Sequence, residues 1–323
     1  MSESVKIYYG LDAGKFLCAL LIIFLHSYCH DWGMAGDWFH DVITPVAVPF
    51  FFIVSGFFFG MGLSKGDSLA YTKKYSSRIL FMYVFWSVIS LPVAQICIQT
   101  RYPDASILFQ LVYHLRLFLL TGSIGIYWYL LSLVICSWII YLADKWKILP
   151  VVFGLSVLFF VIGVIYDSPM AKGTGWAELI HILWGSERNF WNVGLIYMLI
   201  GFYFSMHSVI ERLGICLAGL LISIILKTVE WKCFSFHAFQ LPMAVSLFLI
   251  CKNLKMEWMS NYSLKLRKYS TALYLGHFPL LLLFDFYLSR STIIDYAVVS
   301  ILSLTLYFMV CRFPKQWQRV IYG

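Results

Sequence analysis

Long apolar stretches recur along this 323-residue chain, and they constrain its fold more than any other feature. A helix of about 17–25 apolar residues is long enough to cross the hydrocarbon core of a bilayer, which is about 30 Å thick. Charged residues make up only 12% of the chain, about half the share that is usual in soluble domains. A water-soluble fold of this length could not hide so much apolar surface. We therefore expect an all-α integral membrane protein.

Hydropathy along the chain predicts ten transmembrane helices, with the N- and C-termini in the cytoplasm. The sequence contains no internal repeat and no linker long enough to separate domains. We therefore expect residues 1–323 to form a single polytopic membrane domain. The predicted spans are residues 10–29, 43–63, 79–99, 125–143, 148–166, 190–207, 213–229, 235–252, 270–289 and 292–311.

The distribution of basic residues decides the number of spans. With the N-terminus inside, 16 of the 24 Lys and Arg residues lie on the inner side and seven on the outer side, as the positive-inside rule requires. The stretch 107–122 is apolar but short and contains Gln110, His114 and Arg116, so we interpret it as a helix lying in the interface. If it also spanned, the basic cluster 252–268 would face outward. The net charge of +8 thus reflects membrane topology and does not indicate a nucleic-acid partner.

The first span contains three ionisable residues, Asp12, Lys15 and His26. Such groups cost about 2.5–3.5 kcal/mol each at the bilayer centre, so they mark candidate functional sites. Asp12 and Lys15 are three residues apart and can pair. Lys15 and His26 are eleven residues apart, so both project from one face of the helix, about 16 Å apart along its axis. The alternatives are that Lys15 snorkels to the inner surface and that His26 is hydrogen-bonded between helices.

The second span contributes a pair of small residues, and a cluster of basic residues precedes the third span. Two prolines disrupt the start of the second span, and Ser55 and Gly56 then allow another helix or a ligand to approach closely. The third span is preceded by Lys73, Lys74 and Arg78. These residues either anchor the helix at the inner surface or bind the phosphates of a cytoplasmic donor.

Later segments give weaker signals. Tyr127 and Trp128 open the fourth span, where they serve either as interfacial anchors or as site residues. His277 lies inside the ninth span, where it either lines a pore or packs between helices. The sequence has no glycine-rich phosphate loop, no nucleophile elbow and no metal-binding spacing, so we expect no metal. The outer loop 167–189 adds residues that are either solvated or contact an acceptor, namely Glu178, His181, Glu187 and Arg188.

Five segments together resemble the membrane-bound acyltransferase-3 family. Their order and spacing match along most of the chain, and ten spans with both ends inside is similar to that family's core. The first two segments are the most specific. The five are LDAGKFLCALLIIFLH at 11–26, VPFFFIVSGF at 48–57, KKYSSRIL at 73–80, YWYL at 127–130 and YLGHFP at 274–279.

The resemblance implies an O-acyltransferase in the plasma (inner) membrane of a bacterium. Such enzymes take acyl groups, usually acetyl, from cytoplasmic acyl-CoA and transfer them to envelope polysaccharides, lipids, peptides or other hydroxyl acceptors. By the same resemblance, Lys15 matches the family's basic residue and His26 its essential histidine. Arg78 matches the second residue of an inner R-x-x-R pattern. The first residue of that pattern is Tyr75 here, a departure that Lys74 is the candidate to compensate.

A mechanism follows from these assignments as a hypothesis. We expect Lys15, Arg78, Lys73 and Lys74 to bind the anionic part of acyl-CoA, so that its pantetheine arm runs along the first helix. His26 would then act as general base on the acceptor hydroxyl, or would carry the acyl group transiently. Asp12 would orient Lys15 or cap the helix. Candidate donors to the thioester oxyanion are Ser55, Tyr127, Trp128 and His277.

A transporter or flippase for a glycan or lipid intermediate is the alternative function. In that case Lys15, His26 and His277 would line the path of the substrate. Inverted repeats and helices broken at matching positions would favour transport. A narrow tunnel from a basic inner mouth to His26 would favour the enzyme.

Overall fold

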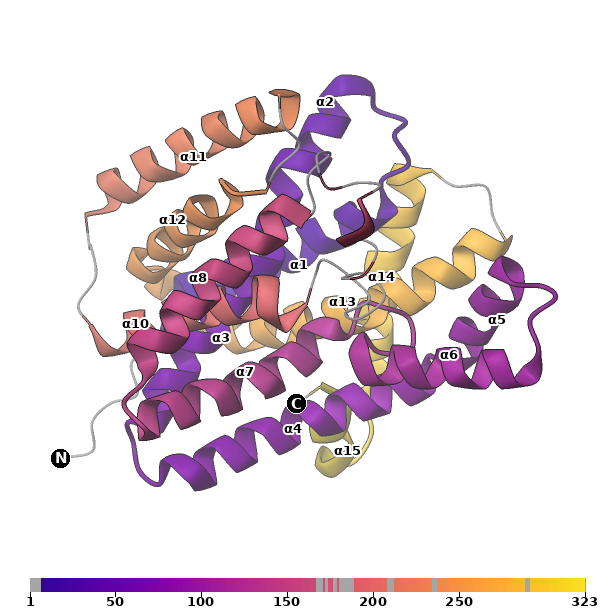
Figure 1. The fold of residues 1–323 in the computed structure, drawn as a ribbon, viewed down its shortest axis with the longest axis horizontal. Coiled ribbons are helices and arrows are strands. Elements are labelled where there is room, and N and C mark those ends of the chain that lie inside the picture. Colours follow the sequence, from indigo (N-terminus) through magenta and orange to yellow (C-terminus); the bar gives the residue numbers. More distant parts are fainter. Residues whose placement is uncertain are drawn as a thin grey trace.

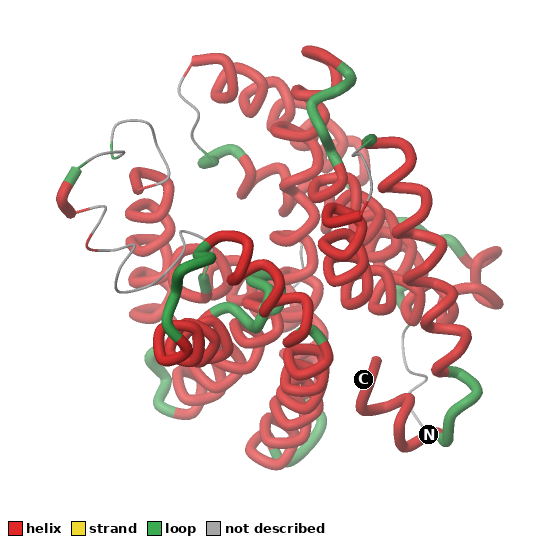
Figure 2. Tube along the Cα trace, turned by 90° about the vertical axis from the view of Figure 1, so that its right-hand side faces the viewer, coloured by secondary structure: helices red, strands yellow, loops and turns green. Residues whose placement is uncertain are grey.

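The structure is a computed structural model that describes residues 7–166, 189–207, 212–233, 237–287 and 291–322, with a few positions between 171 and 179. All regular structure in these ranges is helical (Figures 1 and 2). Six helices are long and apolar enough to cross a membrane, or seven if one bent pair counts as a single span. The all-α membrane class is thus confirmed, while the number of ten spans stays a prediction.

The first span begins and ends close to its predicted limits, whereas the second is longer than expected. Helix α1 covers Tyr9–Ser27. The outer segment predicted as a loop at 30–41 is largely helical, and it joins the second span in one run of 31 residues. Pro45 has no N–H to donate, so the helical run adopts π and 3₁₀ turns around it before the α-helix resumes. The run consists of α2 (Gly33–Trp38), η1 (Phe39–Ile43), η2 (Thr44–Val46) and α3 (Ala47–Leu63).

The predicted third span is a bent pair of helices. Helices α4 (Ser68–Ile89) and α5 (Leu91–Arg101) meet at an angle of 53°. The side chain of Asp67 caps α4 by accepting hydrogen bonds from two backbone amides of its first turn. A proline follows the break in the first turn of α5, where its missing N–H costs nothing.

Helix α6 (Ile107–Leu120) corresponds to the segment that we predicted to lie in the interface. Most of its exposed side chains are apolar, including Leu108 and Leu111, which are more than half exposed, and Arg116 is exposed with them. On its other side Gln110 and His114 form hydrogen bonds to Gln95 of α5. The two helices lie together at one end of the molecule (Figure 1). An apolar outer face and a polar inner face are typical of a helix lying in the interface.

The remaining helices complete the bundle. Helix α13 begins ten residues before its predicted start, and the last helix, α15, was not predicted. Trp86 of α4 donates a hydrogen bond to the carbonyl of Ile321 at 2.7 Å, which fixes α15 against α4. The elements are α7 (Trp128–Lys145), α8 (Leu149–Tyr166), η3 (Phe190–Gly194), α10 (Leu195–Met206), α11 (Leu213–Cys233), α12 (Gln240–Asn253), η4 (Glu257–Met259), α13 (Ser260–Tyr287), α14 (Thr292–Val310) and α15 (Lys315–Tyr322).

Glycines bring α3 and α10 into backbone contact at the centre of the bundle. A Cβ at Gly56 would collide with the carbonyl oxygen of Met198, and a Cβ at Gly201 would collide with that of Ile53. Small residues allow this approach, which gives membrane helices close van der Waals packing. The close approach that the sequence predicted at Gly56 is therefore made by a helix.

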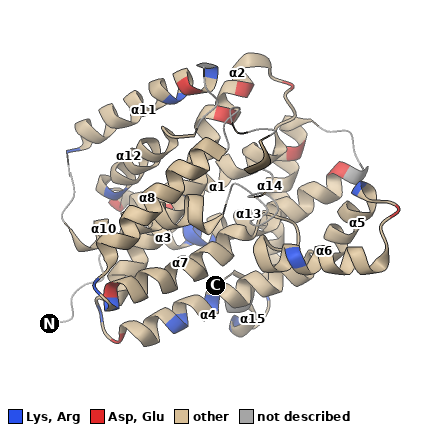
Figure 3. Cartoon of the chain, viewed as in Figure 1, with Lys and Arg blue, Asp and Glu red and all other residues tan. Residues whose placement is uncertain are grey.

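Charged residues lie mostly at helix ends and connections, and the middles of the long helices carry few (Figure 3). Helices α8 and α11 are only 11% and 22% buried over their apolar windows. Exposed apolar side chains of this kind suit a hydrocarbon solvent. The chain is therefore a multi-pass membrane protein.

Candidate active site

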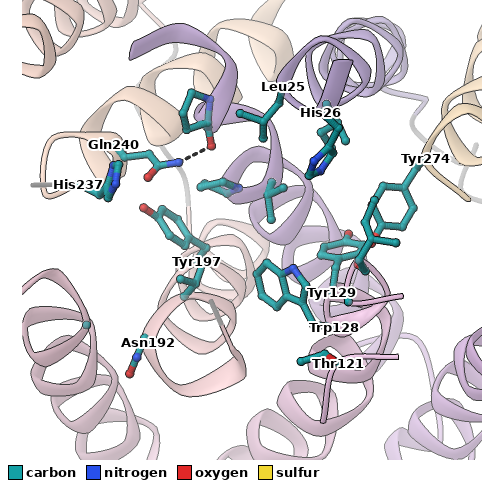
Figure 4. Close-up of a pocket in the computed structure, with 18 of the residues that line it drawn as sticks. Leu25, His26, Thr121, Trp128, Tyr129, Asn192, Tyr197, His237, Gln240 and Tyr274 are labelled. Atoms are coloured by element: carbon teal, nitrogen blue, oxygen red, sulfur yellow. Dashed lines mark hydrogen bonds between the residues drawn. The ribbon is translucent and has the colours of Figure 1, made fainter. Parts of the chain in front are cut away.

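His26 lines a cavity of about 420 Å³ in the interior of the bundle (Figure 4). This volume is within the usual range for small-molecule sites. The wall is mostly apolar and aromatic, and α1, α7, α10, α12 and α13 all contribute to it. The side chains with polar atoms that line it are His26, Thr121, Trp128, Tyr129, Asn192, Tyr197, His237, Gln240 and Tyr274.

Lys15 lies on the same helix as His26, nearer to its N-terminus. Eleven residues at 1.5 Å each separate the two side chains by about 16 Å along the axis. The Lys15 ammonium lies 5.6 Å from the centroid of the Phe58 ring, a cation–π contact with α3. Lys15 also lies within electrostatic reach of Asp12 on its own helix and of Arg267 and Arg78. The structure therefore gathers cations from three helices at this end of α1.

Asp12 has a different partner from the one that we expected. Its carboxylate is fully buried and accepts two hydrogen bonds from Arg267, of 2.9 and 3.0 Å, and one from Ser263 at 2.5 Å. The predicted Asp12–Lys15 ion pair is therefore replaced by a fork-shaped pair between α1 and α13. A bidentate guanidinium satisfies a buried carboxylate better than one ammonium can. No local pattern could predict this pair, because Arg267 is 255 positions away from Asp12.

The basic residues before the third predicted span lie on α4. Lys73, Lys74 and Arg78 are all exposed on that helix. Tyr75, which replaces the first arginine of the expected pattern, packs its ring on Phe59 with centroids 5.0 Å apart. Tyr75 is thus part of the packed core and does not lie among the exposed basic residues of α4.

His277 lies directly behind His26. The two rings are stacked with centroids 5.5 Å apart and planes inclined by 27°. His277 is fully buried, and its Nδ1 lies 2.9 and 2.8 Å from the carbonyl oxygens of Leu273 and Tyr274. Both partners accept, so Nδ1 carries the hydrogen. His277 is not among the residues that line the cavity.

Pro279 explains how Tyr127 is held. A proline cannot donate to the carbonyl four residues earlier, so the carbonyl of Leu275 lacks its helical partner. Tyr127 lies 3.3 Å from that oxygen and 3.1 Å from Ser90, and it is fully buried. The hydroxyl of Tyr127 therefore ties α7 to the proline-containing helix α13.

Of the four candidate oxyanion donors, only Trp128 lines the cavity. Ser55 lies one layer behind, with its hydroxyl 3.0 Å from that of Tyr129. Tyr129 itself lines the cavity, and its ring packs edge-on against Phe52 at 4.6 Å. Ser55, Tyr127 and His277 therefore support the cavity wall from behind.

One group of polar residues was missed from the sequence. Lys227 of α11 is one of the seven basic residues counted on the outer side, yet its side chain and that of Glu230 are each only 2% exposed. Their charged atoms are 2.9 Å apart, and the Lys227 ammonium also lies 3.0 Å from Nδ1 of His237. The K-x-x-E spacing, which places both residues on one helical face, was the available signal.

A second polar network lies just outside the cavity. His40 of η1 forms hydrogen bonds of 2.6 Å to Asp41 and 3.0 Å to the carbonyl of Leu25, next to His26. Trp231 of α11 donates to the other oxygen of Asp41 at 2.9 Å. These contacts connect the C-terminal half of α1 to two neighbouring elements. The suggested acceptor contacts Glu178, His181, Glu187 and Arg188 lie outside the described residues.

A hydrogen-bonded clamp joins the segment that follows the C-terminal end of α1 to α14. The amide of Cys29 donates to the hydroxyl of Thr292 at 2.9 Å, and that hydroxyl donates to Asp31. The hydrogen bonds from Thr292 lower the pKa of the Asp31 carboxyl, because they stabilise its charged form. The clamp fixes the segment that follows His26.

Residues 8–312 match the acyltransferase-3 family, which is described as an acyltransferase domain. The match covers nearly the whole chain, and the chain belongs to this family. A short stretch is also similar to an amino-acid racemase of Enterococcus faecalis, with 45% identity over 53 residues. That stretch is 16% of this chain and 8% of the racemase. No solved structure matches the chain. The fold and the family together define a membrane acyltransferase.

Proposed function

We propose that the protein is an O-acyltransferase that moves an acyl group, most often acetyl, from cytoplasmic acyl-CoA to a hydroxyl of a cell-envelope polysaccharide or another acceptor. The observation that carries the proposal is the arrangement of α1. His26 lines a largely aromatic cavity at one end, while Lys15 lies near Arg78 and Arg267 at the other. Acyl-CoA has the same division, with anionic phosphates at one end and a neutral thioester at the other.

The basic end would hold the phosphates of the donor. Guanidinium groups bind phosphate by paired hydrogen bonds, and ammonium groups add a point charge. Arg267 is 44% exposed, so part of its guanidinium remains accessible while Asp12 occupies one edge. The neutral pantetheine arm would then follow α1 to the cavity. Lys73 and Lys74, exposed on α4, extend the positive field.

At the cavity, His26 would act as the general base. It takes the proton of the acceptor hydroxyl as that oxygen attacks the thioester carbon. The resulting oxyanion collapses, the carbon–sulfur bond breaks, and the leaving thiolate receives the proton from His26. The products are an ester and CoA. The indole N–H of Trp128 is the oxyanion donor that we propose, because Trp128 lines the same cavity.

The proposal includes the predicted topology. Ten spans with both termini in the cytoplasm place the N-terminal end of α1 inside, where acyl-CoA is available. The C-terminal half of α1, which carries His26, then lies toward the outer surface. A bacterial plasma membrane provides both the donor and the envelope acceptor.

The test is release of CoA from acetyl-CoA by purified protein in lipid nanodiscs, with and without a mixture of envelope glycans. Wild type should release CoA, and His26→Ala should lower the rate by about 10²–10⁴-fold, the usual contribution of a general base. His207→Ala is the matched control, since His207 is exposed and stacks on Tyr203 away from the cavity. Equal rates for wild type and His26→Ala would refute the mechanism.

Transport remains the second candidate, because α4 and α5 form a helix pair broken by 53°. The described residues contain one such pair, whereas inverted repeats would give two. Glycan movement across vesicles without acetyl-CoA would favour the transporter. Movement or modification that requires acetyl-CoA would favour the enzyme.

A further inference from the structure

A buried ion pair lies beside the cavity and has no part in the mechanism above. Lys227 and Glu230 are each 2% exposed, although both are ionisable and lie on a helix apolar enough to span a membrane. Their ion pair measures 2.9 Å, and Glu230 also accepts a hydrogen bond of 2.7 Å from the amide of Ala238. Ionisable groups at such places are costly and mark functional sites. The question is what this pair does for the cavity.

The ion pair fixes the hydrogen position on His237. A lysine ammonium has only hydrogens to donate, so the Nδ1 atom that lies 3.0 Å from Lys227 must accept. The hydrogen of the neutral ring is therefore on Nε2, which becomes a donor. The charge of Lys227 is balanced by Glu230, so His237 is oriented without any net charge being added to this wall.

His237 belongs to a polar wall on the side of the cavity away from His26. Figure 4 shows His237, Gln240, Tyr197 and Asn192 together on that side. The Gln240 amide donates to the carbonyl of Pro45, so its own oxygen is left as an acceptor for the cavity. With the hydroxyl of Tyr197, which can donate or accept, the wall offers both donors and acceptors. A hydroxyl needs this combination, since it donates one hydrogen bond and accepts others.

The cavity has no formal charge of its own. None of the described residues that line it is Asp, Glu, Lys or Arg. An anionic group entering it would lose its hydration without finding a cation in direct contact, which is costly in a medium of low dielectric. A neutral group with several hydroxyls would lose hydrogen bonds to water but regain them at the polar wall. Trp128 and Tyr129 supply apolar ring surface beside it.

We propose that the wall formed by His237, Gln240, Tyr197 and Asn192 is the acceptor subsite, and that it takes a neutral, hydroxyl-rich acceptor while excluding one with an anionic group at the same place. The assignment rests on the acyltransferase function proposed above, and it names the part of the cavity that faces the acceptor. Lys227 and Glu230 are positioning residues that act through His237.

The experiment uses two probes that differ at one position, radiolabelled methyl β-D-glucoside and methyl β-D-glucuronide. Their binding to the full-length protein in nanodiscs is measured by equilibrium dialysis. Wild type should bind the glucoside at least about tenfold more tightly than the glucuronide, which corresponds to 1.4 kcal/mol. His26→Ala should keep this preference. His237→Phe should weaken glucoside binding by about tenfold, and His207→Phe, the matched control at an exposed ring, should not change it.

A second variant keeps the test valid if His237→Phe fails to fold. Asn192→Leu preserves side-chain shape, leaves the Lys227–Glu230 pair intact, and should also weaken glucoside binding. Equal or tighter binding of the glucuronide, no binding of the glucoside to wild type, or unchanged binding in both folded variants would overturn the subsite. Failure of the proposed function looks different: glucoside binding would persist without any CoA release. CoA release with the wrong binding pattern would overturn the subsite alone.

Discussion

The ring of His26 on α1 rests on the ring of His277 on α13, with centroids 5.5 Å apart and a 27° angle between the planes. Nδ1 of His277 is fixed by two backbone carbonyls, and its buried Nε2 has no hydrogen-bond partner in the described part of the chain. His277 is therefore a neutral ring whose orientation is set by its own helix. The orientation of His26 depends in turn on the packing of α1 against α13.

Replacing His277 with phenylalanine tests whether His277 only packs against His26 or takes part in acyl transfer. The variant His277→Phe retains an aromatic ring against His26 but loses the hydrogen bonds to Leu273 and Tyr274. We expect kcat for acetyl transfer to fall by about tenfold, compared with about 10²–10⁴-fold for His26→Ala. Steady-state kinetics of the two purified variants measures the difference. A loss in His277→Phe as large as that in His26→Ala would mean that His277 takes part in the chemistry.

The ion pair of Asp12 with Arg267 can be tested by a double-mutant cycle. Arg267→Gln leaves a fully buried carboxylate without its charged partner, which we expect to lower the free energy of unfolding by about 2 kcal/mol. The value is below that of a fully buried pair because Arg267 is 44% exposed. Asp12→Asn combined with Arg267→Gln should recover most of the loss. Thermal unfolding in nanodiscs gives all four values, and additive losses would show that the two residues do not stabilise each other.

Arg78 provides a test of the donor site. We expect Arg78→Gln to raise the KM for acetyl-CoA by about tenfold, because one charge-assisted hydrogen bond to phosphate is lost. The KM for S-acetylpantetheine, which has no phosphate, should not change. Arg101→Gln is the control, since Arg101 lies on α5 and its guanidinium stacks near Tyr102. If both donors were affected equally, Arg78 would act on the fold and not on the phosphates.

The backbone contact between α3 and α10 predicts that one added methyl group will strongly destabilise the protein. Gly201→Ala would force the two backbones apart at Ile53, and we expect it to lower the free energy of unfolding by about 3 kcal/mol or more. Gly154→Ala is the matched control, because a Cβ at Gly154 of α8 meets nothing within 4 Å. That change should be neutral or slightly stabilising, since alanine favours helix. Similar melting curves for the two variants would contradict this packing.

The orientation of α6 distinguishes ten spans from eleven. Fluorophores attached at positions 108, 111, 115 and 119 should all show the same depth when quenched by lipids that carry nitroxides at defined carbons. A helix lying in the interface keeps these positions at one level. If the depth passed through a maximum at the bilayer centre along the helix, α6 would be a span, and every later loop would change sides.

Hydropathy and spacing predicted the features that depend on one helix at a time. The apolar runs indicated α1, α8, α14 and the combined run of η3 and α10 to within two residues, and the eleven-residue spacing placed Lys15 and His26 on one helix. Residue order also identified His277 as unusual before its partner was known. These properties are local, so a single sequence is sufficient to show them.

Partners from distant segments could not be predicted in the same way. Asp12 was paired with its neighbour Lys15, but Arg267 offers two hydrogen bonds in a fixed fork and takes the carboxylate instead. Lys227 was counted only as an outer-side charge, because hydropathy cannot show that it pairs with Glu230 and His237 in the interior. In each case tertiary contacts decided between local alternatives.

The distance along α1 between Lys15 and His26 has an electrical consequence. In the proposed mechanism the phosphates of the donor are held at the basic end, and only the uncharged thioester arm enters the membrane interior. The proton that leaves the acceptor hydroxyl ends on the thiol of CoA, so no net charge crosses the bilayer during turnover. Moving one elementary charge across a potential of 100 mV costs about 2.3 kcal/mol. An enzyme that works in this way is indifferent to the membrane potential, and its rate depends on the supply of its two substrates whether or not the membrane is energised.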